Sequence, residues 1–161
     1  MKLADILELP RTGWDKRIAA DLTAEMRRFL AVKGFRELRH MIEGDIAGKS
    51  GADALRAAMM SLRRYALERP GLSAATFRNP DIDSREWRAA QMELAMVLFG
   101  IFAQLGISGE NAQHALRIAR SFVRGFVLHE MGASFLEPLE HDQSYAAGVE
   151  VFIAGLGVLR N

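Results

Sequence analysis

Apolar residues recur every three or four positions along most of this chain, and no segment shows sustained two-residue alternation. The first spacing puts apolar side chains on one side of an α-helix, whereas a half-buried β-strand requires the second. With 161 residues, half of them hydrophobic, the chain can bury a substantial core in one domain, or in one domain with a small appendage. The sequence therefore predicts an all-α fold.

Proline, glycine and capping residues divide this pattern into helices. Two short helices are expected first, followed by a long connecting helix with Asp21 as its N-cap. Gly106 and Gly132 are expected just beyond the ends of two later helices. The expected helices cover residues 3–9, 12–18, 22–47, 52–68, 72–77, 84–105, 108–131 and 144–159.

Composition narrows the class of protein. The lack of cysteine excludes disulfides and thiolate metal sites. Lys2, Asp5 and Glu8 interrupt the N-terminus where a secretion signal needs an unbroken apolar run. The longest apolar stretch, 94–105, is shorter than the roughly 20 residues that span a bilayer. We therefore expect a soluble, cytoplasmic protein with no membrane partner.

The residues that could support catalysis or bind a metal lack the motifs of either function. No nucleophile motif surrounds Ser73 or Ser121, and the chain has no glycine-rich phosphate loop. His114 and His129 are expected on one helix but about 22 Å apart along its axis, too far to share an ion. We therefore expect no enzymatic activity, no cofactor and no metal. The alternative is a helical enzyme, and the lack of a catalytic motif opposes it.

Four stretches follow one another in a distinctive order: AVKGFRELRHMI, GADALRAAMMSLRRYALERPGLSAATF, GISGENAQHALRIARSFVRGFVLHEMGASF and DQSYAAGVEVFIAGL. The second is a helix bearing Tyr65 that stops at Pro70–Gly71, and the third contains RSFVRGF from Arg120. In order and spacing, residues 31–156 resemble the C-terminal ligand-binding and dimerisation domain of tetracycline-repressor (TetR) family regulators. Arg124 is a departure, because relatives often have histidine there.

The N-terminal segment LADILELPRTGWDKRI is similar to the second half of that family's helix-turn-helix DNA-binding head. The family's first helix would lie before Met1. The resemblance implies a partial head over 1–21, a connecting helix over 22–47 and a ligand-binding and dimerisation domain over 48–161. A mild basic excess agrees with this, since residues 1–40 hold nine Lys/Arg against six Asp/Glu. The expected DNA-binding residues are Arg11, Thr12, Lys16 and Arg17.

The family resemblance also implies a ligand site. Methionine and aromatic side chains are large and adaptable, and they suit a cavity for an apolar molecule with one or two polar contacts. The same side chains at helical spacing also form ordinary cores, and that alternative stays open. The expected ligand-binding residues are Met59, Tyr65, Phe77, Trp87, Met92, Met96, Phe99, Phe102 and Phe122.

The last two long helices are apolar on more than one side, so they need more cover than one chain easily provides. Pairing with a second copy about a two-fold axis would give a dimeric four-helix bundle. The expected dimer-interface residues are Phe122, Val123, Phe126, Val127, Val149, Phe152 and Leu156.

With these features the chain resembles a homodimeric, ligand-responsive transcriptional repressor that binds operator DNA and a small apolar or amphipathic effector. The alternative is a small-molecule-binding or heterodimerising helical module that has lost DNA binding. Its support is the incomplete head, because a helix-turn-helix without its third helix has little core to hold its recognition helix rigid.

Overall fold

A computed structural model of the chain describes residues 16–77 and 84–160. The described residues form helices and contain no strand, which confirms the all-α prediction. The elements are α2 (Lys16–Ile46), α3 (Gly51–Glu68), α4 (Pro70–Thr76), α5 (Arg85–Gln104), α6 (Gly109–Met131), α7 (His141–Gly155) and the 3₁₀ helix η1 (Leu156–Leu159).

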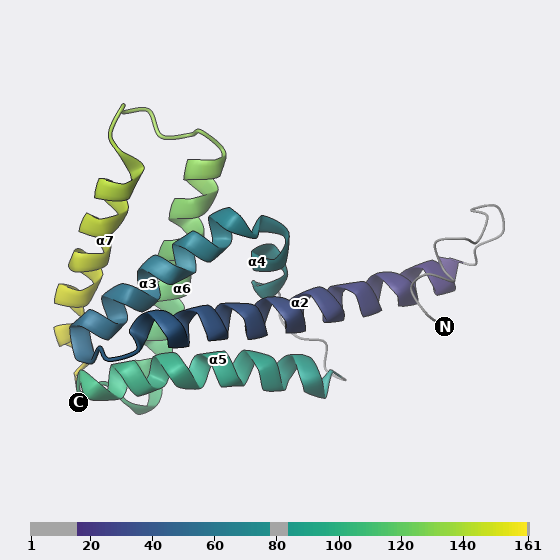
Figure 1. Cartoon of the computed structure of the whole chain (residues 1–161), viewed down its shortest axis with the longest axis horizontal. Helices are drawn as coiled ribbons and strands as arrows, with labels where there is room; N and C mark the ends of the chain where they lie inside the picture. Colours follow the sequence, from purple (N-terminus) through teal and green to yellow (C-terminus); the bar gives the residue numbers. More distant parts are fainter. Residues whose placement is uncertain (1–15, 78–83, 161) are drawn as a thin grey trace.

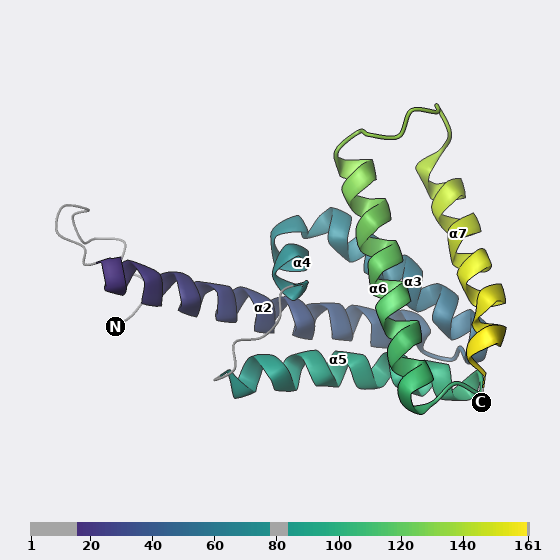
Figure 2. The same cartoon turned by 180° about the vertical axis from the view of Figure 1, so that it is seen from behind.

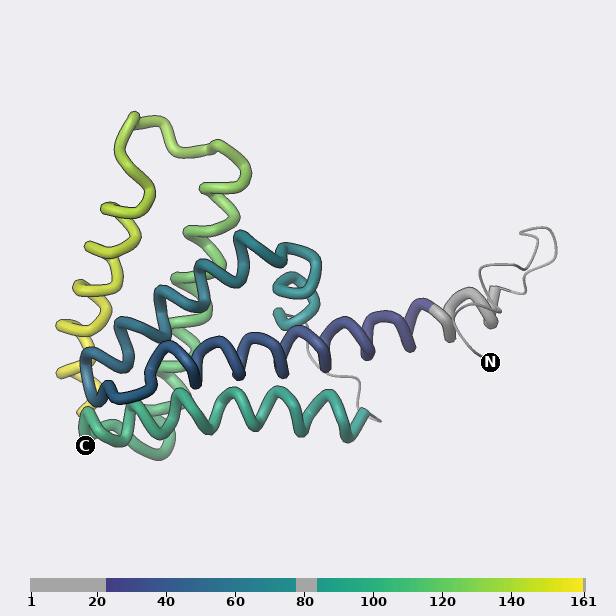
Figure 3. Tube along the Cα trace, in the orientation of Figure 1, coloured from purple at the N-terminus to yellow at the C-terminus, as the bar shows by residue number. Residues whose placement is uncertain are grey.

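The helix α2 runs along the long dimension of the molecule, with α5 alongside it and α3 and α4 packed against its C-terminal half (Figure 1). The view from behind shows α6 and α7 standing side by side across this layer (Figure 2). The N-terminal turns of α2 extend beyond the rest of the described chain, as the Cα trace also shows (Figure 3). The bundle is therefore built on one end of a long helix.

The expected start of the connecting helix is wrong. The helix α2 is continuous from Lys16 through Asp21 to Ile46, so Asp21 is an internal residue rather than an N-cap. The sequence around it, RIAADLTAEM, contains neither glycine nor proline, and aspartate inside a helix costs only a few tenths of a kcal/mol to about 0.7 kcal/mol relative to alanine. A residue that favours caps therefore does not stop a helix whose neighbours all propagate it.

Several other ends agree with the sequence. The helix α5 ends at Gln104, and Gly106 follows in the left-handed conformation with φ of 76°, as expected for a residue just past a C-cap. Pro70 does more than stop α3, because it occupies the first turn of α4, where a missing N–H is harmless. The last helix differs: α7 begins at His141, three residues before the expected start, and residues 156–159 form the 3₁₀ helix η1.

The core lies between α2, α3, α5 and the inner side of α6. Ile42, Leu55, Met59, Ile101 and Phe102 are all 2 % exposed or less. Burying an apolar side chain of this size contributes about 1.5–3 kcal/mol, so this cluster fixes how α3 and α5 sit against α2.

In the part of the chain that the structure describes, no single helix has the length and apolar composition needed to cross a membrane. Only α5 and α6 taken together have that length and composition, and they are bent by 114° relative to each other.

Candidate ligand-binding site and dimer surface

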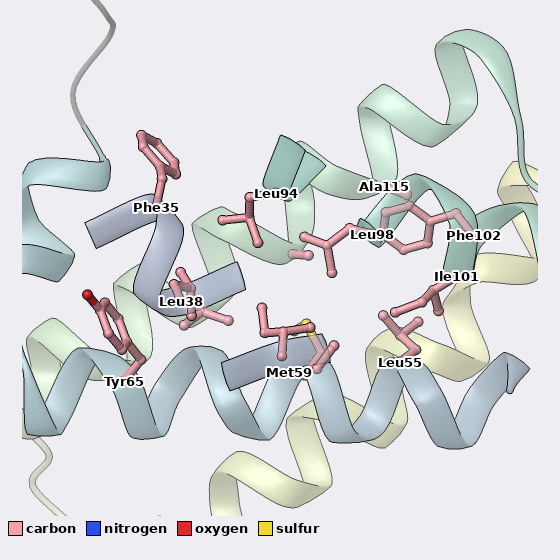
Figure 4. Packing of buried hydrophobic residues seen from close by; sticks show 14 of the residues in the cluster. Phe35, Leu38, Leu55, Met59, Tyr65, Leu94, Leu98, Ile101, Phe102 and Ala115 are labelled. Atoms are coloured by element: carbon pink, nitrogen blue, oxygen red, sulfur yellow. The ribbon is translucent and has the colours of Figure 1, made fainter. Parts of the chain in front are cut away.

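Four of the nine residues expected to bind a ligand are buried in the core: Met59, Tyr65, Trp87 and Phe102. Figure 4 shows Tyr65 at one end of this core and Phe102 at the other, with Met59 between them. These side chains do not surround one described cavity. In the described chain they pack as a continuous hydrophobic core, which is the alternative that the sequence left open.

Three further expected ligand residues are half-buried: Phe99 and Phe122 pack against the core, and Phe77 lies at the end of α4. Met92 and Met96 are different, because they lie on the outer side of α5 with 57 % and 59 % of their surface exposed. The structure therefore does not bring these two methionines together with the other seven residues that were expected to bind a ligand. Their spacing of four residues puts them on one side of the helix, but on the side that faces away from the core.

Two buried aromatic residues carry polar groups that a ligand could use. The Tyr65 hydroxyl donates a hydrogen bond of 3.3 Å to the Glu37 carboxylate, and burial together with that carboxylate raises the pKa of Tyr65. The Trp87 indole Nε1 is buried and has no hydrogen-bond partner among the described residues. A buried N–H without a partner costs about 1–3 kcal/mol, so it is a natural donor for a bound molecule.

Two arginines of α6 lie beside the end of α4 and form a basic edge of the described bundle. Arg120 of α6 donates a 3.1 Å hydrogen bond from Nη2 to the Thr76 carbonyl at the end of α4. The guanidinium carbon of Arg120 lies 5.9 Å from the centre of the Phe77 ring, and that of Arg124 lies 4.8 Å from it. Both distances are within the range of cation–π interactions. Both guanidinium groups therefore lie against the ring of Phe77.

This basic edge is connected to α2 through Thr76 and Gly34. A Cβ atom on Gly34 would lie 2.8 Å from the Leu72 carbonyl oxygen and 2.9 Å from the Thr76 methyl carbon, closer than real Cβ contacts. The helices α2 and α4 can therefore pack this tightly because residue 34 has no side chain. The end of α4 therefore lies directly against the middle of α2.

Sequence reasoning missed a buried ion-pair cluster that joins α3, α6 and α7. Arg63, whose side chain is 8 % exposed, donates to Glu130 from Nε at 2.9 Å and from Nη2 at 2.7 Å. Its Nη1 is 2.8 Å from an Asp142 oxygen, and its guanidinium lies over the rings of Phe126 and Tyr145. Hydrogen bonds to Glu130 raise the pKa of Arg63. A charged residue on the apolar side of an expected helix was the available signal.

A cavity of about 80 Å³ lies next to this cluster, between the facing ends of α6 and α7. Its lining includes Phe126, Phe135 and His141, and the two phenylalanine rings are 5.1 Å apart. Of the residues expected to bind a ligand, none lines this cavity. Within residues 16–77 and 84–160, no three histidine, aspartate or glutamate side chains are placed to hold a metal ion.

The residues expected at the dimer interface turn inward. Val123, Val127, Val149 and Leu156 are at most 5 % exposed within the single chain, so they already serve its own core. Phe122 stacks on Tyr145 of α7 at 5.3 Å, and it too joins α6 to α7 within one protomer. The two remaining expected residues, Phe126 and Phe152, are half-buried against the core.

Other apolar residues of the same helices are exposed instead. Ile118 and Leu128 of α6 are 49 % and 60 % exposed, and Val151 and Val158 of α7 and η1 are 73 % and 87 % exposed. We call these four residues the outer apolar face. A helix that is apolar on two sides uses one for its own core, and the sequence pattern did not show which side that was.

The expected DNA-binding residues lie at or beyond the start of α2. Arg11 and Thr12 lie outside the described residues. Lys16 and Arg17 are in the first turn of the described part of α2, at the end that extends away from the bundle. The expected helix over 3–9 and the first four residues of the expected helix over 12–18 also lie outside the described residues, whereas residues 16–18 are continuous with α2.

The described architecture is an all-helical bundle, in which a long N-terminal helix enters a set of shorter helices that ends in two long adjacent ones. Residues 55–152 match the family described as the tetracyclin repressor-like, C-terminal domain. Since this match covers more than half of the chain, the chain belongs to the TetR family, which confirms the resemblance seen in the sequence.

A relative in Mycobacterium tuberculosis (strain ATCC 25618 / H37Rv), named an uncharacterized HTH-type transcriptional regulator, is 27 % identical over 137 residues. The aligned region covers 84 % of this chain and 62 % of the relative. The chain therefore spans less than two thirds of the length of this relative.

Proposed function

We propose that this chain is the ligand-sensing and dimerising part of a transcriptional repressor, in which a small, largely apolar molecule binds at the edge of the core between α4, α5 and α6. The contact of Thr76 and Leu72 with Gly34 carries this proposal, because it joins that edge to the helix that leads toward the DNA-binding head. Membership of the TetR family and the regulator named in M. tuberculosis support it.

Phe77, the half-buried aromatic residue at this edge, offers apolar surface to a ligand. Trp87 of α5 has a buried indole N–H without a partner among the described residues. Binding changes DNA affinity only if the ligand has different affinities for two arrangements of the domain. The tight α2–α4 contact supplies such a difference, since a ligand that displaces α4 must also shift or strain α2.

We also infer that two copies pair through the outer apolar face. Ile118 and Leu128 are separated by ten residues, and Ser121 and Gly125 lie between them at three- and four-residue spacing. This gives one straight stripe of apolar and small residues along α6. An isologous interface buries the same stripe of both copies, and small residues let the helices approach closely.

Dimerisation is tested by size-exclusion chromatography with light scattering. We expect a dimer for the chain and a monomer for the double variant Ile118→Glu/Val151→Glu, because two charges would be buried at each half of the interface. Met92→Glu, which changes an equally exposed residue of α5, is the matched control and should leave the dimer intact. A monomeric wild-type chain at micromolar concentration would refute this part of the proposal.

DNA binding is tested by fluorescence anisotropy with labelled DNA from upstream of the chain's own gene. Specific binding that competitor DNA of unrelated sequence does not remove is the expected result. Dimers that show only salt-sensitive, sequence-independent binding would instead support a helical module without operator recognition.

A further inference from the structure

We propose that the small molecule bound by this domain carries a carboxylate, which Arg120 and Arg124 bind beside the ring of Phe77. This inference rests on the ligand-binding role proposed above and adds the charge of the ligand to it. Three features support it: the two arginines converge on one ring, neither pairs with a carboxylate of the described residues, and Arg120 is connected to α2 through Thr76.

The two arginines are one helical turn apart on α6 and converge on the same ring. Their guanidinium carbons lie 5.9 Å and 4.8 Å from the centre of Phe77. Arg120 is half-buried and anchored by its bond to the Thr76 carbonyl, while Arg124 is exposed. One guanidinium is thus held in place at the edge of the core, and the other can close over a bound group from the solvent side.

Arg120 and Arg124 lack the carboxylate partner that five other described arginines of the bundle have, a property that they share with exposed arginines such as Arg117. Arg36, Arg39 and Arg63 each have a carboxylate within 3.0 Å. Over residues 23–77 and 84–160, neither Arg120 nor Arg124 is within ion-pair distance of a carboxylate.

Burial, and then the neighbouring charge of Arg124, lower the pKa of Arg120. Two like charges held close together at the edge of an apolar core cost free energy that an anion would recover. The planar guanidinium offers paired N–H donors that match the two oxygens of a carboxylate. The rest of such a ligand would meet the ring of Phe77, which is half-buried at the end of α4.

Binding at Arg120 also acts on the α2–α4 contact. A carboxylate bound at Arg120 would compete for its N–H donors, one of which bonds the Thr76 carbonyl. The Thr76 methyl lies against Gly34 of α2, so a change in this hydrogen bond reaches α2 through one residue. An acidic group therefore has a direct route to the helix that leads toward the head.

The test uses isothermal titration calorimetry of the full chain with three acids of different shape: hexanoate, decanoate and 4-phenylbutanoate. Each acid is compared with its own amide, which has nearly the same shape and no charge. We expect at least one acid to bind on the order of 10- to 100-fold more tightly than its amide, as charge-assisted hydrogen bonds predict. Arg120→Gln and Arg124→Gln should each remove most of this preference, whereas Arg120→Lys should keep part of it.

The matched control is Arg117→Gln, which removes an exposed positive charge one turn earlier on α6 and should leave the preference unchanged. Because Arg124 is exposed, its variant keeps the test decisive even if Arg120→Gln fails to fold. Equal binding of acids and amides, or an equal loss in all three Gln variants, would overturn the carboxylate inference. So would failure of every acid to bind; binding of the amides in that case would leave the proposed ligand site standing.

Discussion

Replacing Gly34 by alanine tests the closest contact between α2 and α4. The added Cβ would lie 2.8 Å from a backbone oxygen of Leu72, which cannot rotate away, and 2.9 Å from the Thr76 methyl carbon. Overpacking of this kind costs about 1–3 kcal/mol, whereas removing a glycine from a helix interior stabilises it by about 0.5–1 kcal/mol. A Cβ at Gly44 on the same helix would meet nothing within 4 Å, so Gly44→Ala should gain the stabilisation from removing a helical glycine without causing a clash.

Both variants gain the stabilisation from replacing a helical glycine by alanine. The difference between their free energies of unfolding therefore measures the cost of the clash at Gly34. We expect Gly44→Ala to be more stable than wild type and Gly34→Ala to be less stable than Gly44→Ala by about 1–3 kcal/mol. For a chain of this length each kcal/mol moves Tm by about 2–4 °C, so the Tm values should differ by roughly 2–12 °C. Thermal unfolding followed by circular dichroism at one protomer concentration measures this. Equal Tm values would show that α4 does not press on α2.

Two further predictions concern single polar contacts. The Tyr145 hydroxyl donates a 2.6 Å hydrogen bond to the Met59 carbonyl inside the core. Tyr145→Phe removes this bond and should lower the free energy of unfolding by about 1 kcal/mol and Tm by a few degrees. The Ser61 hydroxyl and then the Arg64 guanidinium hold the pKa of Asp45 below its ordinary 3.8. The ionised carboxylate therefore stabilises the fold above pH 3.8, and this stability is lost as the pH falls through the lowered value. Unfolding curves from pH 6 to pH 2 should show a smaller acid-induced drop in Tm for Asp45→Asn than for wild type, and identical pH profiles would contradict the assignment.

Helix content and most helix ends could be predicted because local signals set them. Gly106 and Pro70 end or begin helices through backbone geometry, which acts within a few residues. Asp21 misled the prediction because a capping preference is weak and depends on whether the preceding residues are already helical. The start of α2 is therefore set by its whole neighbourhood and not by one residue.

The candidate site was less predictable because it depends on which side of each helix faces inward. Met92 shares α5 with Trp87, yet Met92 is exposed and Trp87 is buried. Val123 and Leu128 share α6, and only the second is on the outer apolar face. Hydrophobicity alone ranks these residues alike, and tertiary packing decides between them. The role of Arg63 is non-local in the same way, since its partner Glu130 lies 67 residues away.

The length of α2 gives the Gly34 contact a mechanical consequence. Eighteen residues separate Gly34 from Lys16, which is about 27 Å of helix at 1.5 Å per residue. A tilt of only about 5° around Gly34 would move the far end by roughly 2 Å, a size typical of helix shifts in switching proteins. In the proposed two-fold dimer the displacements of both far ends add, so a small rotation deep in the bundle would alter the separation of the two proposed DNA-binding heads, which have to match successive turns of the major groove.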